Sequence, residues 1–299
     1  TAAKEDQQHD LFENSAALLF GVGEYLRESV AWFGARNAYC IVPGFPSPFE
    51  KNVAGDDPLR IVIAGRFDAD GEPLKQSKLV AAGLGRAIRQ AGPEVRTLMQ
   101  AELNVFGASD AMIAGAELER LVQREAGRSM AVIARRFDAE RGILRHLVRA
   151  NLAVMPSVRE GFGLVGWEAI GCEVPLIVGA DTGLVSFLNK AFDNHADRYV
   201  VPIELSGETL NEGDVERMAA AIRSIAKDVF GARERAATLR AKLVDRFKGC
   251  TWPAAAETFL ADCGIPVAPW PTDLARTAGG QTGGSGGKPA PFSETVNNN

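Results

Sequence analysis

Short apolar segments alternate with longer amphipathic segments along most of the chain. The short segments have the length of strands, and the segments between them repeat apolar residues at helical spacing. The pattern predicts strands at residues 60–65, 103–107, 130–133, 152–155, 176–178 and 199–201. It predicts helices at about residues 74–90, 111–125, 139–149, 212–228, 232–247 and 252–262. Buried strands that alternate with helices are typical of a parallel sheet covered on both faces, so we expect an α/β, Rossmann-like fold.

The two ends of the chain depart from this pattern. Residues 10–33 repeat apolar positions at helical spacing, interrupted by Gly21-Val22-Gly23, and residues 38–43 predict a short strand. Residues 49–58 are charged, and the end of the chain is rich in Pro and then in Gly and Ser, as linkers are. We therefore divide the chain into a disordered N-terminus (1–9), a helix, strand and linker (10–58), a Rossmann-like domain (59–263) and a flexible tail or linker (264–299).

Residues 151–188 carry the strongest chemical signal in the chain. They read as strand, glycine loop, helix, strand, glycine loop and helix. Glu160 and Glu168 bracket the first loop, Gly161-Phe162-Gly163. A helix that begins after such a loop presents unpaired N–H groups and attracts an anion. A phosphate near Gly163 would lie between two carboxylates that can bind hydroxyl groups, an arrangement that suits a sugar nucleotide.

Composition argues against several other classes of protein. The net charge of -5 disfavours a general nucleic-acid binder, which normally has a basic surface. No apolar run approaches the roughly 20 residues of a transmembrane helix, and no signal peptide is visible, so we expect a cytosolic protein. The four cysteines show no C-x-x-C spacing, which favours free, buried thiols in a reducing compartment over disulfides or a zinc site.

The order of the motifs resembles the C-terminal half of a GT-B glycosyltransferase of the retaining class called group 1 or family 4. That family has a strand ending in Gly-Arg, a Lys that opens the next helix, a Pro-Ser-x-x-Glu-Gly-Phe-Gly-Leu-x-x-x-Glu-Ala string and a later Gly-rich turn. The matching residues are Gly65, Arg66, Lys75, Pro156, Ser157, Glu160, Gly161, Phe162, Gly163, Leu164, Glu168, Ala169, Pro175 and Gly183. The resemblance covers about residues 14–262, and residues 14–45 resemble the end of the N-terminal half.

The resemblance implies a role for each residue in binding a nucleotide-sugar donor. Arg66 and Lys75 would bind the diphosphate and stabilise negative charge on the leaving nucleotide. Glu160 would contact the sugar and phosphates, and Glu168 the ribose hydroxyls. The catalytic candidates are Arg66, Lys75 and Glu160, and the donor-binding candidates are Gly65, Phe162, Gly163, Leu164, Glu168 and Gly183. The base would contact residues 134–137, and neither a cofactor nor a metal ion is expected.

The chain also departs from the family pattern. Thr182 stands where the family often has the first Gly of a Gly-Gly pair, and Ser186 replaces a Glu. Glu173 replaces a Gly, although a positive φ is costly for other residues. The N-terminal half, which binds the acceptor in the family, is absent from this sequence. The resemblance therefore implies that this chain binds a donor better than it transfers the sugar.

Several of these residues have simpler interpretations. Glu160 and Glu168 could form a solvated helix face, or the acid and base of a hydrolase. We prefer the donor site because a ribose-binding role does not require a raised pKa at Glu168. Lys78, one turn after Lys75, is a second candidate for the phosphate, and Arg66 could instead pair with Asp68.

Other motifs favour structural roles. Asp68-Ala69-Asp70 matches the metal-binding Asp-x-Asp of another glycosyltransferase fold, but its place after the first strand favours a solvated turn. Gly21-Val22-Gly23 follows no predicted strand, which disfavours a dinucleotide motif. We expect His146 at the surface and Cys172 in the core. Two further functions stay open: a non-catalytic sensor of nucleotides or nucleotide-sugars inside a larger protein, and, with less support, a sugar-nucleotide epimerase.

Overall fold

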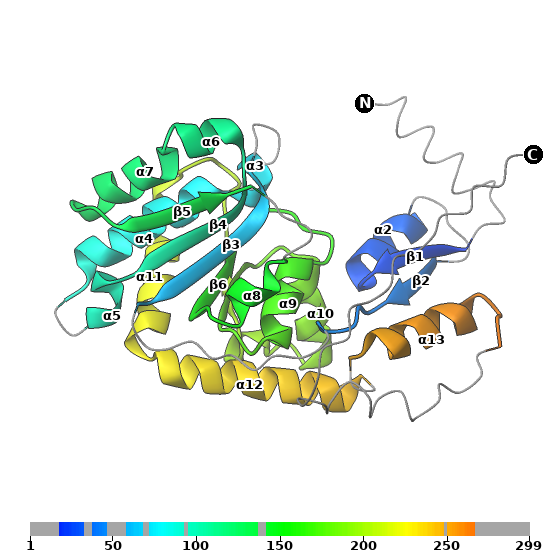
Figure 1. Cartoon of the computed structure of the whole chain (residues 1–299). Helices are drawn as coiled ribbons and strands as arrows, with labels where there is room; N and C mark the ends of the chain where they lie inside the picture. The colour runs from blue at the N-terminus through cyan, green and yellow to red at the C-terminus, as the bar shows by residue number, and fades with distance from the viewer. Residues whose placement is uncertain are drawn as a thin grey trace, which may run out of the picture.

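The computed structural model describes residues 18–32, 38–46, 58–67, 72–92, 95–136, 142–247 and 250–266. Most of them form an α/β domain around a six-stranded sheet in the order β5-β4-β3-β6-β7-β8 (Figure 1). The strands are β3 (Arg60–Phe67), β4 (Glu102–Ala108), β5 (Ala131–Arg135), β6 (Leu152–Met155), β7 (Leu176–Gly179) and β8 (Val201–Ile203). Every neighbouring pair is parallel, which confirms the expected Rossmann-like sheet.

Helices cover both faces of this sheet, as predicted. One face packs against α4 (Ser77–Gln90), α7 (Glu117–Ala126) and α11 (Glu212–Lys227). The other packs against α8 (Leu144–Leu147), α9 (Leu164–Gly171), α10 (Gly183–Ala191) and α12 (Val229–Arg246). Every residue of β6 and of β7 is buried, because strands covered on both faces have no polar side. Short helices complete the domain: α3 (Glu72–Lys75), α5 (Arg96–Met99), α6 (Asp110–Ala114) and the 3-10 turn η1 (Ala196–Arg198).

The strand order places a crevice at the centre of the sheet. The chain runs outward from β3 through β4 to β5 and then returns to β6 on the other side of β3. The two connections therefore leave β3 and β6 in opposite directions. In open α/β sheets, ligands bind outside the carboxyl ends of the strands at such a switch point. Gly65 and Arg66 lie at this end of β3, and the loop that starts at Pro156 follows β6.

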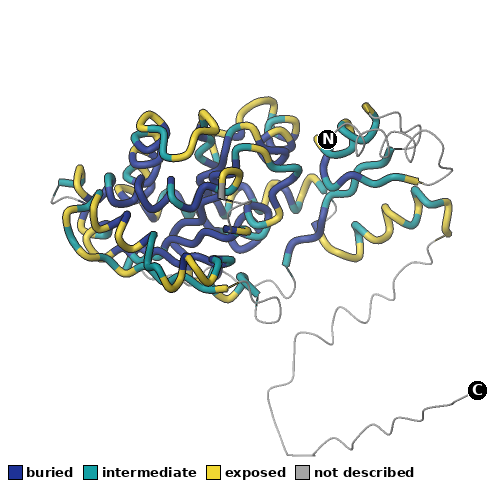
Figure 2. The backbone as a smooth tube through the Cα atoms, turned by 90° about the horizontal axis from the view of Figure 1, so that it is seen from above, coloured by how far each residue is buried: buried dark blue, intermediate teal, exposed yellow. Residues whose placement is uncertain are grey.

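A small lobe lies beside the main domain in Figure 1. It consists of β1 (Leu19–Val22), α2 (Glu24–Trp32), β2 (Ala38–Ile41) and α13 (Trp252–Asp262). β1 and β2 pair in parallel, and the ring of Phe20 packs on Tyr39 at 5.3 Å and on Phe259 at 4.6 Å. No residue of α2 or α13 is buried, and Figure 2 shows the lobe mostly in the colours of intermediate and exposed residues.

The helical spacing read on both sides of Gly21-Val22-Gly23 gave the wrong element for the described residues before Gly23. Residues 19–22 form strand β1, and helix α2 begins only at Glu24. The spacing of apolar residues did not distinguish the strand from the helix, because β1 and α2 are both half-buried. The partner of β1 lies beyond α2, so the pairing depends on a contact that is distant in sequence. The predicted N-terminal region 1–9 and nearly all of the predicted tail 264–299 lie outside the described residues.

Other predicted boundaries need smaller corrections. The helix expected from about residue 74 is two helices, because Gln76 adopts a left-handed conformation with φ 52° between α3 and α4. Ala116, with φ 45°, separates α6 from α7 in the same way. β8 starts two residues later than predicted, after the 3-10 turn η1. Of the helix expected at residues 139–149, the described part contains only α8, which ends at Leu147.

In the parts of the chain that the structure describes, no helix has the length and apolar character needed to cross a membrane. All four cysteines are free thiols; Cys172 and Cys250 are buried, and Cys40 and Cys263 are half-buried.

Candidate functional site

A pocket of about 510 Å³ opens at the carboxyl ends of β3 and β6. It contains most of the residues that the sequence predicts for a donor site. The lining residues are Val22, Leu26, Ala64, Gly65, Lys75, Met155, Glu160, Gly161, Phe162, Gly163, Leu164 and Val165. The strand ends, the glycine loop and α2 of the small lobe therefore enclose one space.

Lys75 and Glu160 meet inside this pocket. The ammonium group of Lys75 forms an ion pair with Oε2 of Glu160, and the Ser157 hydroxyl donates to the same oxygen at 3.2 Å. The N–H of Val158 donates to the carbonyl of Leu74 at 3.0 Å, which joins α3 to the loop after β6. This backbone contact holds the base of the Lys75 side chain beside Glu160.

The glycine loop leads directly into α9. Gly163 precedes the first helical residue and has φ 97°, in the left-handed region that favours glycine. A Cβ on Gly163 would lie 2.6 Å from Cε of Met155, so a larger residue would also collide with the end of β6. No side chain caps the N-terminus of α9. Its first N–H groups are therefore available to an anion in the pocket.

The second glycine loop packs against the first. The N–H of Gly183 donates to the carbonyl of Glu160 at 3.0 Å, and a Cβ on Gly183 would lie 1.9 Å from the carbonyl oxygen of Gly161. Thr182 has φ -125°, so it does not need to be glycine. Its hydroxyl donates to the carbonyl of Gly179 at 2.9 Å and accepts from the N–H of Val185. Gly183 contacts the pocket loop but does not line the pocket.

An aromatic cluster beneath the loop was missed by the sequence reasoning. Phe162 is buried and packs on Trp167 and Phe187, with ring centroids 5.5 and 5.8 Å apart. Trp167 is fully buried, stacks on Phe45 at 4.4 Å and donates from Nε1 to the carbonyl of Pro43 at 3.1 Å. The signal was present as a Trp inside the glycine-loop motif, but its contact with residues 43–45 is distant in sequence.

Glu168 lies outside this pocket, in the second turn of α9. Its carboxylate has no hydrogen-bond or ion-pair partner among the described residues, and burial raises its pKa. The donor site was preferred over a hydrolase acid because a ribose-binding Glu168 needs no raised pKa. The raised pKa of Glu168 removes that argument. Glu160 lines the pocket and contacts Lys75, whereas Glu168 lies outside the pocket.

Arg66 also lies outside the set of lining residues. It is exposed near the end of β3, where the pairing with β4 shifts register between Ala64 and Phe67. Asp68, its alternative partner, and the whole Asp68-Ala69-Asp70 motif lie outside the described residues. The structure thus brings together Gly65, Lys75, Glu160, Phe162, Gly163 and Leu164 in the pocket, but not Arg66, Glu168 or Gly183.

A model described as family 4 glycosyltransferase in conflict systems matches residues 1–259. The chain belongs to this family. The resemblance inferred from the Gly-Arg, Lys and Pro-Ser to Glu-Ala motifs is thereby confirmed at the level of the family.

Individual relatives agree with this assignment. The chain is 28% identical over 223 residues to a D-inositol 3-phosphate glycosyltransferase of Geodermatophilus obscurus, covering 70% of this chain and 45% of that protein. It is 34% identical over 120 residues to a glycogen synthase of Mycobacterium tuberculosis, covering 40% of this chain and 26% of the synthase. The chain therefore spans less than half of these curated relatives.

Solved structures show the same fold. HepE of Anabaena, solved in complex with UDP and glucose, superposes with a TM-score of 0.66 at 15% identity, covering 88% of this chain and 67% of that one. Sucrose-phosphate synthase of Thermosynechococcus elongatus gives a TM-score of 0.62 at 20% identity, covering 93% and 62%. At such low identities these likenesses establish the fold alone.

The structure shows how the chain accommodates two departures from the family pattern. Glu173, at a position where the family often has glycine, does adopt a positive φ of 58°. Arg240 supports this turn, since its Nε donates to the carbonyl of Gly171 at 3.1 Å and its guanidinium lies 3.9 Å from the Glu173 carboxylate. Ser186, in place of the family Glu, is exposed on α10.

The remaining candidates lie away from the pocket. Lys78 forms an ion pair with Glu117 on α7 at 2.7 Å. His146 is half-buried rather than exposed at the surface. It packs on Phe106 at 4.5 Å, and burial, with Arg135 nearby, lowers its pKa. Within the described ranges, no three His, Cys, Asp or Glu side chains cluster as ligands for a metal ion.

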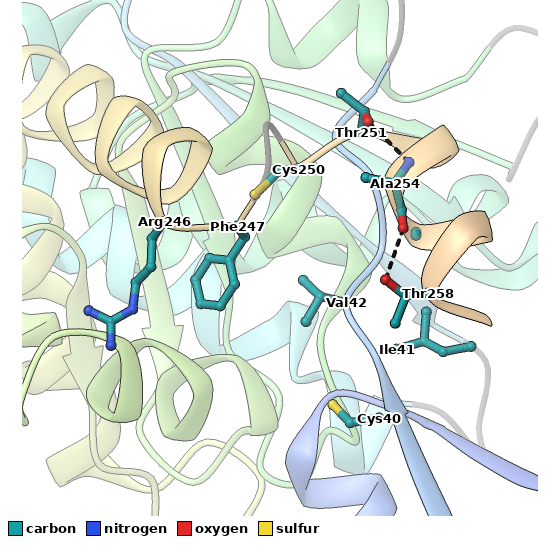
Figure 3. Close-up of a pocket in the computed structure, with 10 residues that line it drawn as sticks. Cys40, Ile41, Val42, Arg246, Phe247, Cys250, Thr251, Ala254 and Thr258 are labelled. Atoms are coloured by element: carbon teal, nitrogen blue, oxygen red, sulfur yellow. Dashed lines mark hydrogen bonds between the residues drawn. The ribbon is translucent and has the colours of Figure 1, made fainter. Parts of the chain in front are cut away.

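A second pocket, of about 270 Å³, lies where the small lobe joins the main domain (Figure 3). β2, the end of α12 and the start of α13 line it, and Cys40 and Cys250 face it from opposite sides. The Thr258 hydroxyl already donates to the carbonyl of Ala254 at 3.0 Å, and burial raises the pKa of the Cys250 thiol to about 11. Arg246 is the charged residue among those that line this pocket.

Proposed function

We propose that this chain is the donor-binding domain of a retaining glycosyltransferase that takes a hexose from a nucleotide-sugar. The observation that supports this most is the Lys75 ammonium group beside the uncapped N-terminus of α9, in a pocket at the switch point of the sheet. A cation and a set of free N–H groups that face one space form a binding site for an anion.

The arrangement assigns a place to each part of the donor. The diphosphate would bind Lys75 and the backbone of Gly163 and Leu164, with the sugar on the Glu160 side. Glu168, further along α9, would bind the ribose hydroxyls, and a hydrogen bond from ribose would give its unpartnered carboxylate a donor. Arg66 would reach the diphosphate from the end of β3, and residues 134–137 would contact the base.

This site would perform the chemistry of sugar transfer through electrostatics. As the bond between sugar and diphosphate breaks, negative charge accumulates on the leaving nucleotide. Lys75 and the N-terminus of α9 would stabilise that charge in a partly desolvated pocket. With these groups neutralising the phosphates, we propose that transfer needs no metal ion. The bound UDP in HepE supports a nucleoside diphosphate as the leaving group.

The small lobe supports the proposal that a second half completes the enzyme. A two-stranded parallel sheet is a poor folding unit by itself, because parallel sheets are normally covered on both faces. Large apolar side chains remain exposed here, including Tyr25 at 43%, Trp32 at 82% and Trp252 at 55%. We propose that an acceptor-binding half packs against this lobe, as the greater length of the relatives suggests.

A non-catalytic sensor is the second candidate. Arg66 lies outside the residues that line the pocket, and Ser186 stands where the family has a Glu, so the chain differs at two positions from what the resemblance implies for a transferase. A sensor would bind the nucleotide-sugar with the same pocket and release it unchanged. Enzyme and sensor therefore predict equal binding but different fates of the donor.

Thermal denaturation in the presence of UDP, GDP, ADP and their sugars tests the proposal. A ligand at 100 times its Kd stabilises a folded protein by about 2.7 kcal/mol, which is easily measured. We expect one diphosphate to stabilise the chain, also in the presence of EDTA. Glu168→Ala should reduce this effect, whereas Asp70→Ala should not. The absence of any shift at millimolar concentration would contradict the donor site, and equal losses in both variants would contradict the role of Glu168.

A further inference from the structure

The pocket has two unlike walls. Lys75, Glu160 and the start of α9 form a charged and polar wall. Val22 and Leu26, both from the small lobe, contribute an apolar part of the lining, the apolar wall. A ligand that fills this space therefore meets both charged groups and apolar side chains.

The small lobe packs directly on the glycine loop. Leu26 occupies the space beside Gly161, where a Cβ would lie 2.8 Å from Cδ2 of Leu26. The backbone at Gly23 contacts the ring of Phe162 in the same way. Glu24, between these two contacts, forms an ion pair with Lys190 of α10 at 3.2 Å. The apolar wall is thus held at a fixed place relative to the loop.

The order in which the diphosphate, ribose and sugar would lie along the loop decides which part of the donor contacts the apolar wall. With the diphosphate at the N-terminus of α9 and the ribose toward Glu168, as proposed, the sugar would lie toward Glu160 and Gly161, which line the pocket. Leu26 contacts the loop at this end. A sugar hydroxyl placed against Leu26 and Val22 would lose water without gaining a partner, which is unfavourable. A methyl group in the same place would bury apolar surface instead.

We infer that Val22 and Leu26 determine which donor sugar is accepted, and that they favour a sugar with a methyl-bearing substituent on this side. Sugars with a methyl group at C6, the 6-deoxyhexoses, belong to this class. The inference rests on the proposed function, because it assumes that the diphosphate binds at Lys75. Two residues of the small lobe thereby act as specificity-determining residues, although the lobe contributes no charged group to the pocket.

Competition between matched donors tests this inference on the full chain. The pair shares whichever diphosphate binds: UDP-6-deoxyglucose against UDP-glucose, GDP-6-deoxymannose against GDP-mannose, or ADP-6-deoxyglucose against ADP-glucose. We expect the methyl-bearing donor to bind at least roughly fourfold tighter, the ratio that corresponds to burying one methyl group. Leu26→Asn and Val22→Thr, which place a polar group at nearly constant size, should abolish the preference. Val30→Thr, on α2 but outside the pocket lining, should keep it.

The affinity for the free diphosphate separates the outcomes. It should stay within about twofold in all three variants, which also shows that they fold. Equal or inverted affinities for the two sugars in the wild type would overturn the inference, as would an unchanged preference in Leu26→Asn and Val22→Thr. In both cases retained diphosphate binding would leave the proposed function standing. If no diphosphate binds the wild type, both proposals fall. Should Leu26→Asn fail to fold, the result for Val22→Thr decides.

Discussion

Lys75 and Glu160 form an ion pair although they lie 85 positions apart in the chain. Lys75 ends α3, in the connection after β3, and Glu160 follows β6. β3 and β6 are neighbours, so the carboxyl ends of two parallel strands bring the side chains together. The pair therefore lies where two connections meet at the switch point of the sheet, and we propose that the donor diphosphate binds there.

Glu160→Gln should change the affinities for the free diphosphate and for the nucleotide-sugar in opposite directions. Removing the carboxylate frees Lys75 and relieves repulsion, so we expect the diphosphate alone to bind about two- to tenfold tighter. The nucleotide-sugar should bind more weakly than to the wild type, because the carboxylate no longer accepts hydrogen bonds from sugar hydroxyls. Titration calorimetry with both ligands measures the two effects.

Glu117→Gln is the matched control for that experiment. It removes the carboxylate that pairs with Lys78, outside the pocket, and should leave both affinities unchanged. Weaker binding of the free diphosphate to Glu160→Gln would show that the carboxylate does not compete for Lys75.

Glu168→Gln should stabilise the ligand-free chain at neutral pH. Burial raises the pKa of Glu168, so the folded chain holds this proton to a higher pH than the unfolded chain does. Stability therefore falls as the pH rises from the unfolded pKa of roughly 4.3 through the folded value, and the ionised carboxylate remains unfavourable above it. The Gln amide of the variant does not ionise, so its burial lacks the cost of burying a charge.

Urea denaturation of wild type and Glu168→Gln between pH 4 and pH 8, at about one-unit steps, measures this difference. The advantage of the variant should be present at pH 7 and should shrink as the pH falls toward about 4. A constant difference across this range would mean that ionisation of Glu168 does not affect folding.

Gly163→Ala should destabilise the chain more than Gly127→Ala. Both glycines have a positive φ, 97° and 72° respectively, so both variants carry a backbone penalty of roughly 1 kcal/mol. Only at Gly163 would the new methyl group collide with Met155; nothing lies within 4 Å of it at Gly127. Overpacking of this kind adds about 1–3 kcal/mol.

Chemical denaturation gives both free energies of unfolding, and calorimetry should show a loss of diphosphate affinity in Gly163→Ala alone. Equal destabilisation by the two substitutions would show that the loop can move away from Met155.

The sequence predicted those parts of the fold in which the signal is local. β6 and α13 have the predicted boundaries, because four apolar residues between turn signals mark the first and Thr251 with Pro253 marks the start of the second. β1 was missed because only its pairing with β2, beyond α2, makes it a strand. The breaks at Gln76 and Ala116 were missed for a similar reason, since neither residue type signals a left-handed conformation.

The same division holds for the candidate site. The glycine loop and Lys75 could be found from motif order, and the structure places Lys75 in the pocket and Lys78 against Glu117. The contributions of Val22, Leu26 and Trp167 could not be found in this way. Each depends on contacts between the small lobe or residues 43–45 and the loop, more than a hundred positions away.

Titration calorimetry of the best-binding nucleoside diphosphate against wild type, Lys75→Ala and Lys78→Ala tests the central claim most directly. Charge-assisted hydrogen bonds are worth about 1.5–3 kcal/mol, so Lys75→Ala should weaken binding by roughly 10- to 150-fold. Lys78→Ala removes the same charge one turn away and should stay within about twofold of the wild type. Undiminished binding by Lys75→Ala, or equal losses in the two variants, would contradict a diphosphate site at the junction of β3 and β6.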